Sequence, residues 1–113
     1  MGSLAIRAKF EPLRSLAYTS ITSSYVAVGS PLANPGRIMK VDNLTNALLI
    51  FSIDGINNHF VVPANGFFLV DLCSNKSQKH GLYMPTGATL FVKESGTPSS
   101  GSVYFSMIYG SEA

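Results

Sequence analysis

Apolar and polar residues alternate along much of this chain with a period of two. Near the C-terminal end, every second residue is large and apolar: Val103, Phe105, Met107, Tyr109. The intervening positions are Tyr104, Ser106 and Ile108. A period of two is that of a β-strand, in which successive side chains point to opposite faces of a sheet. The pattern predicts a strand over 102–109 with the first set on one face and the second set on the other.

The N-terminal segment repeats this pattern, with Arg7 and Lys9 on one side and these apolar residues on the other: Leu4, Ile6, Ala8, Phe10. It predicts a half-buried strand with one wet face, which Pro12 ends. Two interpretations of residues 1–14 remain open. The segment is either an arm that adds a strand to a neighbouring subunit or the first, edge strand of its own domain.

Further strands are predicted where β-branched, aromatic and other apolar residues cluster, at 15–22, 25–28, 37–41, 47–53, 58–62, 67–72 and 89–94. The run 47–53 is almost continuously apolar, which is typical of a strand buried on both faces. Turn residues separate the strands at 29–36, 43–46, 63–66 and 73–87. Asp54-Gly55 predicts a hairpin, and 95–101 is predicted to be a flexible hairpin tip.

No segment has apolar residues at helical spacing with helix caps. About eight or nine short antiparallel strands, spaced by turns roughly every 8–12 residues, predict an all-β fold. The 113 residues fit one domain, so we expect a single β-sandwich or jelly-roll-like domain over residues 1–113.

The composition is poor in charge: 12% of the residues are charged and 46% are hydrophobic. Soluble proteins carry about 25% charged residues. The surface must therefore be covered by small polar and apolar groups, and such surfaces often become buried in an assembly. The basic residues are scattered, and the densest group, Lys76 to His80, is too sparse for a phosphate backbone. We expect no nucleic-acid partner.

Cys73 is the only cysteine, which excludes an intrachain disulfide. Arg7 and Lys9 interrupt the N-terminal segment where a signal peptide needs an apolar run, and no apolar run approaches the ~20 residues that span a bilayer. We therefore expect synthesis in a host cytoplasm without a membrane partner. The sequons beginning at Asn43 and Asn75 are interpreted as turn residues.

Few residues are candidates for chemistry. A metal at His59 would need Asp54 and Asp71 to approach it in space. A thiolate mechanism would need Cys73 beside His80, again with Asp71, but those residues fall at a strand end and in a polar loop. There is no Gly-x-Ser-x-Gly elbow and no glycine-rich phosphate loop. We expect no catalytic residue, cofactor, metal or small-molecule substrate.

Aromatic residues leave a second function open. A sugar-stacking surface could be built from Tyr25, Tyr83, Tyr104, Tyr109 and the pair Phe67-Phe68. Trp, the residue that most favours sugar stacking, is absent, so an aromatic core and an interface are the preferred interpretation of these residues. The alternative function that stays open is a carbohydrate- or receptor-binding β-sandwich module.

Three motifs carry a resemblance to a known group: the turn Asn43-Leu44-Thr45, the hairpin Ser52-Ile53-Asp54-Gly55, and the late strand that begins Pro85-Thr86-Gly87-Ala88 and continues Thr89-Leu90-Phe91-Val92. With the segments 62–66 and 69–72, they resemble the small β-sandwich structural proteins of tailed bacteriophages over roughly residues 15–110.

The resemblance implies a virion component at the head–tail neck or collar, on the capsid as a decoration protein, or associated with the tail. It transfers no catalytic or ligand-binding residue. On this basis we expect a non-enzymatic virion structural protein, a homo-oligomer whose partners are copies of itself and other virion proteins.

Overall fold

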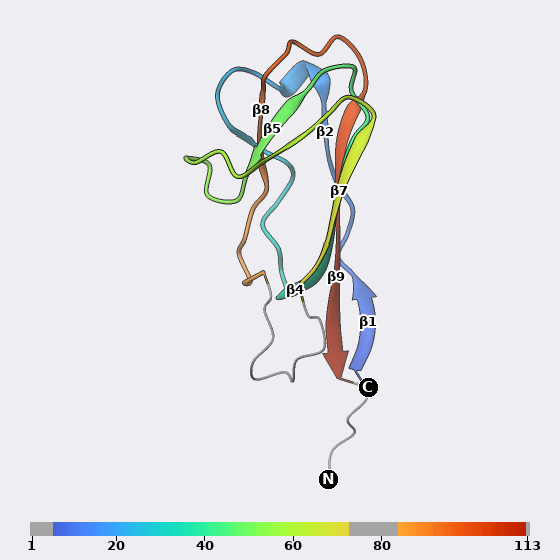
Figure 1. The fold of residues 1–113 in the computed structure, drawn as a ribbon. Helices are drawn as coiled ribbons and strands as arrows, with labels where there is room; N and C mark the ends of the chain where they lie inside the picture. The colour runs from blue at the N-terminus through green and yellow to red at the C-terminus, as the bar shows by residue number, and fades with distance from the viewer. Residues whose placement is uncertain (1–5, 73–83, 113) are drawn as a thin grey trace.

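The computed structural model describes residues 6–72 and 84–112, and within them the chain forms β-strands and one short 3₁₀ turn (Figure 1). The elements, in chain order, are these: β1 (Ile6–Phe10), β2 (Arg14–Ala17), the 3₁₀ turn η1 (Tyr18–Ser20), β3 (Val26–Ala27), β4 (Gly36–Asn43), β5 (Leu49–Ser52), β6 (Phe60–Val62), β7 (Gly66–Asp71), β8 (Phe91–Glu94) and β9 (Ser102–Glu112).

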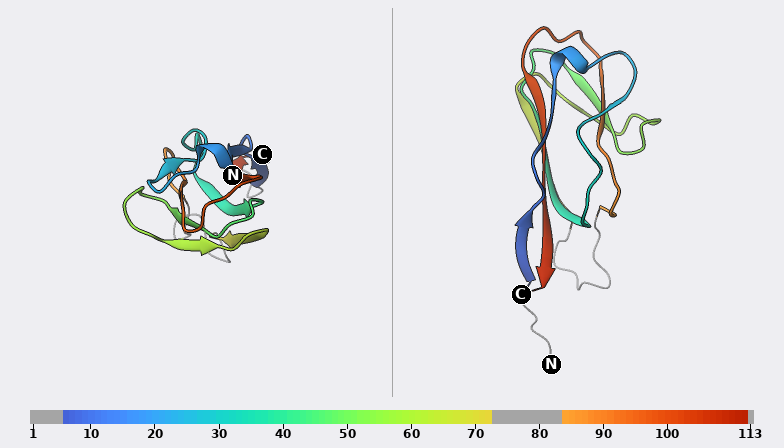
Figure 2. Two further views of the ribbon diagram at one scale, coloured as in Figure 1. Left: turned by 90° about the horizontal axis from the view of Figure 1, so that it is seen from above. Right: turned by 180° about the vertical axis from the view of Figure 1, so that it is seen from behind.

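The strands form two antiparallel sheets that face each other (Figures 1 and 2). The first sheet has the order β1-β9-β4-β7, and β2 pairs with β9 further along the same edge as β1. The second sheet has the order β3-β8-β5-β6. Counting β1 and β2 as one interrupted strand, the first strand lies beside the last. Successive strands alternate between the two sheets, except that the hairpin β5–β6 stays within the second sheet. This is the strand order of a jelly roll, which confirms the predicted fold class.

Between the sheets lies one core of alternate side chains. The first sheet contributes Met39, Val41, Val103, Phe105 and Met107, and the second contributes Leu49, Phe51, Val62 and Val92. Three stacked rings cross from one sheet to the other, with Phe60 centred 5.3 Å from Phe51 and 4.3 Å from Phe68. The face predicted for 102–109 is confirmed at Val103, Phe105 and Met107, which are all buried.

The N-terminal strand forms, but Phe10 does not enter the core. β1 pairs with β9 of its own chain at the edge of the first sheet. Phe10 is 71% exposed, which makes the predicted buried face wrong. The cause is register. Phe10 lies opposite Ile108, and β9 turns Met107, not Ile108, toward the core.

Two predicted connections differ in the structure. The segment 95–101 is not a hairpin tip, because β8 and β9 belong to different sheets and the chain crosses between them. Asn46 and Ser99 hold this crossing through hydrogen bonds of 2.7 and 2.8 Å. The Asp54-Gly55 hairpin does join the antiparallel strands β5 and β6, but its loop spans residues 53–59. The strand predicted at 15–22 ends at Ala17, where η1 begins.

Asn43 joins the two sheets from a fully buried position at the end of β4. Its amide nitrogen donates to the carbonyls of Ala47, Val62 and Pro63 at 2.9, 2.9 and 3.1 Å. Its amide oxygen accepts from the backbone N–H and the hydroxyl of Thr45 at 3.0 and 2.6 Å. The sequon asparagine is thus a structural residue of the turn, as predicted, and its side chain is inaccessible in the folded protein.

A buried ion pair stabilises the short segment that connects β1 to β2. Arg14 and Glu11 are both buried, and a guanidinium nitrogen lies 3.3 Å from Oε1 of Glu11. The guanidinium also donates to three backbone carbonyls, at 2.7–2.8 Å, those of Pro12, Ser30 and Pro31. The other carboxylate oxygen of Glu11 accepts from the backbone and side-chain nitrogens of Asn34 at 2.8 and 2.9 Å.

The surroundings of Glu11 favour its charged form. Burial alone would raise the pKa of Glu11. The hydrogen bonds from Asn34 and from the backbone of Ala33, together with the charge of Arg14, outweigh burial and hold the pKa below its usual value. The cluster therefore ties the β1–β2 corner to the loop 30–34 most strongly while Glu11 is ionised.

Candidate functional site

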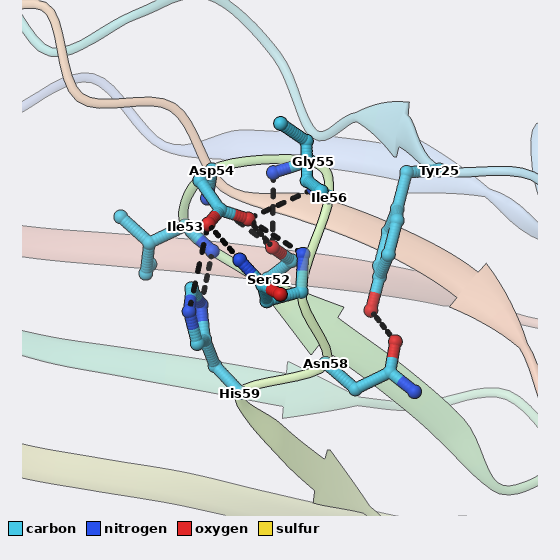
Figure 3. Close-up of polar contacts among 9 residues, drawn as sticks. Tyr25, Ser52, Ile53, Asp54, Gly55, Ile56, Asn58 and His59 are labelled. Carbon is cyan, nitrogen blue, oxygen red and sulfur yellow. Dashed lines mark hydrogen bonds and ion pairs between the residues drawn. The ribbon is translucent and has the colours of Figure 1, made fainter.

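Asp54 organises the loop that joins β5 to β6 (Figure 3). One carboxylate oxygen accepts hydrogen bonds from the Ser52 hydroxyl and from the backbone nitrogens of Ile56 and Asn57, each 2.8 Å long. The other accepts from the Asn57 side chain, also at 2.8 Å. The backbone donors of Asn57 and Ile56, followed by the side chains of Asn57 and Ser52, hold the pKa of Asp54 well below its usual value. Gly55 supplies the positive φ of 75° that this loop requires.

Ser52, Asp54 and His59 lie together, but their hydrogen bonds do not form a catalytic triad. The ring nitrogen Nδ1 of His59 accepts from the backbone N–H of Ile53 at 2.9 Å, and its Nε2 lies 3.8 Å from Asp54. The Ser52 hydroxyl is fully buried and donates to Asp54 rather than to the imidazole. Nucleophilic catalysis needs the base beside the hydroxyl, so this arrangement stabilises the loop instead.

The same contacts bear on the metal hypothesis. The carboxylate oxygens of Asp54 already accept hydrogen bonds from N–H and O–H donors. Nδ1 of His59 already accepts from the backbone N–H of Ile53. Asp71 ends β7, in the other sheet from β6 and its loop. Within residues 6–72 and 84–112, no group of three or more His, Cys, Asp or Glu side chains is placed to hold a metal ion. Cys73 and His80, the thiolate candidates, and the basic group 76–80 lie outside the described residues.

Tyr25 closes one side of this loop (Figure 3). Its hydroxyl donates to the side-chain oxygen of Asn58 at 2.5 Å, and the amine of Lys93 lies 4.7 Å from the centre of its ring. Partial burial, with a contribution from the charge of Asp54, raises the pKa of Tyr25. The phenol therefore stays protonated and acts as a hydrogen-bond donor that fixes Asn58.

The outer face of the first sheet carries several exposed apolar side chains. Across this sheet, residues in register form three rows: Phe10–Ile108–Ile38–Asp71, Ser106–Lys40–Leu69, and Tyr104–Asp42–Phe67. Phe10, Phe67 and Leu69 are 71%, 62% and 57% exposed. We call the side chains of Phe10, Ile38, Phe67, Leu69 and Ile108 the apolar face. A monomeric protein rarely leaves so many large apolar groups together in water.

The centre of the apolar face is hollowed. An open hollow of about 220 Å³ is lined by Phe10, Ile38, Lys40, Leu69, Ser106 and Ile108. Lys40 is its charged lining residue; the Lys40 amine lies 3.3 Å from the Asp42 carboxylate and 5.1 Å from the centre of the Phe67 ring. The hollow is thus largely apolar, with a locally neutralised charge at one side.

The aromatic residues considered for sugar stacking do not form one platform. Phe67 and Tyr104 share a row on the apolar side of the first sheet, on either side of Asp42. Phe68 packs inward against Phe60, and Tyr25 lies beside the β5–β6 loop. Tyr83 lies outside the described residues.

Sequence reasoning missed the apolar face. The run 67–70 is apolar at every position, so its alternation between core and surface is invisible in the sequence. Knowledge of the pairing with β4 would have revealed the apolar face. Lys40 and Asp42 lie opposite Leu69 and Phe67, so the two apolar residues share the outward side of the sheet with these charged ones.

No helix within the described ranges is long and apolar enough to cross a membrane. Comparison with known proteins adds no relative: no protein-family model matches the chain, and no curated protein is significantly similar to it.

Proposed function

We propose that this chain is a non-enzymatic structural protein of a tailed-bacteriophage virion, which self-assembles at the head–tail neck or collar or on the capsid surface. The observation that carries the proposal is the apolar face. Phe67 and Leu69 are exposed on the regular strand β7, next to the hollow. Burying each such side chain against another subunit stabilises an assembly by about 1.5–3 kcal/mol before the cost of association.

Two further features support the proposal. Many capsid proteins have a jelly-roll fold, and lectins and enzymes have it too. The fold therefore supports a role in a capsid but does not distinguish it from those other functions. The polar loop 53–59 is engaged in its own hydrogen bonds, and its serine hydroxyl is buried. The surface suited to recognition is therefore apolar, and the phage resemblance of the turn and strand motifs supplies the virion context.

The test is electron cryo-microscopy of purified particles from a phage that encodes this chain. We expect repeated copies of the jelly roll at the neck or on the shell, with the apolar face in contact with protein. A Phe67→Asp/Leu69→Asp variant should fold but fail to join the particle. Leu44→Asp is the matched control, because Leu44 is 50% exposed in the turn after β4, outside the apolar face. Particles that lack the wild-type chain would refute the proposal.

A carbohydrate- or receptor-binding module is the second candidate, and one observation favours it. Phe67 and Tyr104 flank the Asp42 carboxylate in one row, which places aromatic rings beside a hydrogen-bond acceptor. A glycan array tests this function. A specific signal that Phe67→Ala abolishes and Phe10→Ala retains would favour sugar binding over assembly.

A further inference from the structure

The turn between β6 and β7 contains the only Asn-Gly pair of the sequence, Asn65-Gly66. Asn65 has a positive φ of 59°, a left-handed conformation that asparagine tolerates better than most residues. The N–H of Gly66 donates to the carbonyl of Pro63 at 3.0 Å and closes the turn. Asn65 is exposed, and within the described part of the chain its side-chain amide has no hydrogen-bond partner. This carboxamide is therefore free to approach the backbone of the next residue.

The pair holds both groups of an intramolecular reaction. Once hydroxide removes the proton of the Gly66 nitrogen, that nitrogen can attack Cγ of Asn65. The new C–N bond closes a cyclic imide, a succinimide, and Nδ2 takes a proton from water and leaves as ammonia. Water then opens the ring at either carbonyl and gives aspartate or isoaspartate. The two reacting groups belong to adjacent residues, so they need no encounter, and Gly66 has no Cβ that would hinder the attack.

One hydrogen bond opposes the attack, because the N–H of Gly66 must first leave the carbonyl of Pro63. The turn does not depend on this bond alone. The Pro63 carbonyl also accepts from the buried amide of Asn43 at 3.1 Å, and the carbonyl of Val62 accepts from the same amide at 2.9 Å. Asn43 thus still holds the start of the turn when the N–H of Gly66 turns away. The reaction needs a local opening of the turn, and β6 and β7 can stay folded.

The Asp54-Gly55 pair, which could form the same cyclic imide, is restrained by the fold (Figure 3). The Asp54 carboxylate accepts from the Ser52 hydroxyl, from the N–H groups of Ile56 and Asn57, and from the Asn57 side chain. The N–H of Gly55 donates to the Ser52 hydroxyl oxygen at 2.9 Å. These donors also hold the pKa of Asp54 low, so the carboxylate stays ionised and is a poor electrophile. Both reacting groups are engaged here, in contrast to the free carboxamide of Asn65.

We propose that Asn65 is a site of spontaneous deamidation in the folded protein, where the chain slowly converts to a form with aspartate or isoaspartate at position 65. Each conversion adds a negative charge to the turn that leads into β7, close in sequence to Phe67 of the apolar face. Isoaspartate also lengthens the backbone at the entry to this strand. Older copies of the protein therefore differ chemically from new ones beside the apolar face. The inference does not rest on the proposed virion role.

Peptide mass spectrometry of the aged full chain tests this site. Samples are aged at one pH, folded or in guanidinium chloride, then digested, and isoaspartate at positions 54 and 65 is identified by enzymatic methylation. We expect Asn65 to convert no more than about 10-fold more slowly in the folded chain than in denaturant, since one exposed hydrogen bond holds the attacking nitrogen. Folding should slow isomerisation of Asp54 at least about 100-fold, because several hydrogen bonds must break there. The rate at Asn65 should rise in proportion to hydroxide concentration.

Asn65→Gly is the matched control, because glycine adopts the same positive φ and lacks the carboxamide. This variant should not develop the more acidic form that ion-exchange chromatography resolves in the aged wild type. A folded chain that protects Asn65 by more than about 10-fold refutes the inference, since the turn then blocks the attack. An acidic form that appears equally in Asn65→Gly also refutes it, because the charge then arises at another residue. Neither result bears on the virion role, which imaging of the particles tests separately.

Discussion

The buried amide of Asn43 makes the sharpest stability prediction. Replacing Asn43 by Ala removes the donor to the carbonyls of Ala47 and Val62, and the acceptor for the N–H of Thr45, all in a fully buried position. A buried polar group that loses its partner costs about 1–3 kcal/mol. The Ala47 carbonyl also accepts from the Thr45 hydroxyl at 3.3 Å, so two groups are counted, the Val62 carbonyl and the Thr45 N–H. At the lower limit for each, Asn43→Ala should reduce the free energy of unfolding by about 2 kcal/mol.

Urea unfolding followed by circular dichroism, extrapolated linearly to water, measures this change. Asn46→Ala is the control within the same turn, because Asn46 is exposed and bonds to Ser99 across an exposed loop. It should cost less than about 1 kcal/mol. A loss below 1 kcal/mol for Asn43→Ala would refute the assignment of this amide as the link between the sheets.

Asn43→Asp gives an independent check through pH. The carboxylate would face three carbonyl oxygens in a buried position, which raises its pKa. Because protonation restores one donor, the deficit of this variant relative to wild type should shrink as pH falls, whereas that of Asn43→Ala should not.

Three further predictions concern other parts of the fold. The folded protein lowers the pKa of Glu11, so the ionised carboxylate stabilises the fold at pH values above its unfolded pKa, near 4.5. This stabilisation is lost as the pH falls from there through the folded-state pKa. Glu11→Gln should therefore reduce the pH dependence of stability in this acid range, which an acid unfolding curve measures. Gly101→Ala should destabilise the fold much more than Gly87→Ala, although both glycines have φ of 91°. A Cβ at Gly101 would lie 2.0 Å from the Leu44 carbonyl oxygen, whereas one at Gly87 meets nothing within 4 Å. The melting temperatures of the two variants measure the difference. Asp54→Ala removes the acceptor of two loop amides, so their hydrogen exchange should accelerate while exchange in β4 is unchanged.

The strands were predictable from the sequence because alternation and turn residues act locally. The period of two in β9 gave the correct core face, since Val103, Phe105 and Met107 follow a strand that the two neighbours of β9 hold in register. At Phe10 the same reasoning failed. Its face depends on pairing with Ile108, almost a hundred residues further along the chain, and no local pattern encodes that register.

The candidate site was predictable only in part. The sequence indicated that Asp54 and His59 could approach, and they do, but their hydrogen bonds turn out to stabilise a loop. The apolar face was not predictable, because Phe67 and Leu69 are chemically similar to their buried neighbours in β7. Only the pairing of β7 with β4 separates the inward side chains from the outward ones.

The central place of β9 also has a consequence for how the chain folds. β9 joins β1 and β2 to β4, yet it follows all the other described strands along the chain. The second sheet contains only strands that end by Glu94, so it can form on a ribosome-bound chain, whereas the first sheet stays divided until β9 emerges. Until then, β4 exposes an unpaired apolar edge, and closure waits for contacts between the two ends of the sequence. Such long-range pairing slows folding and prolongs the time during which the exposed edge of β4 can aggregate.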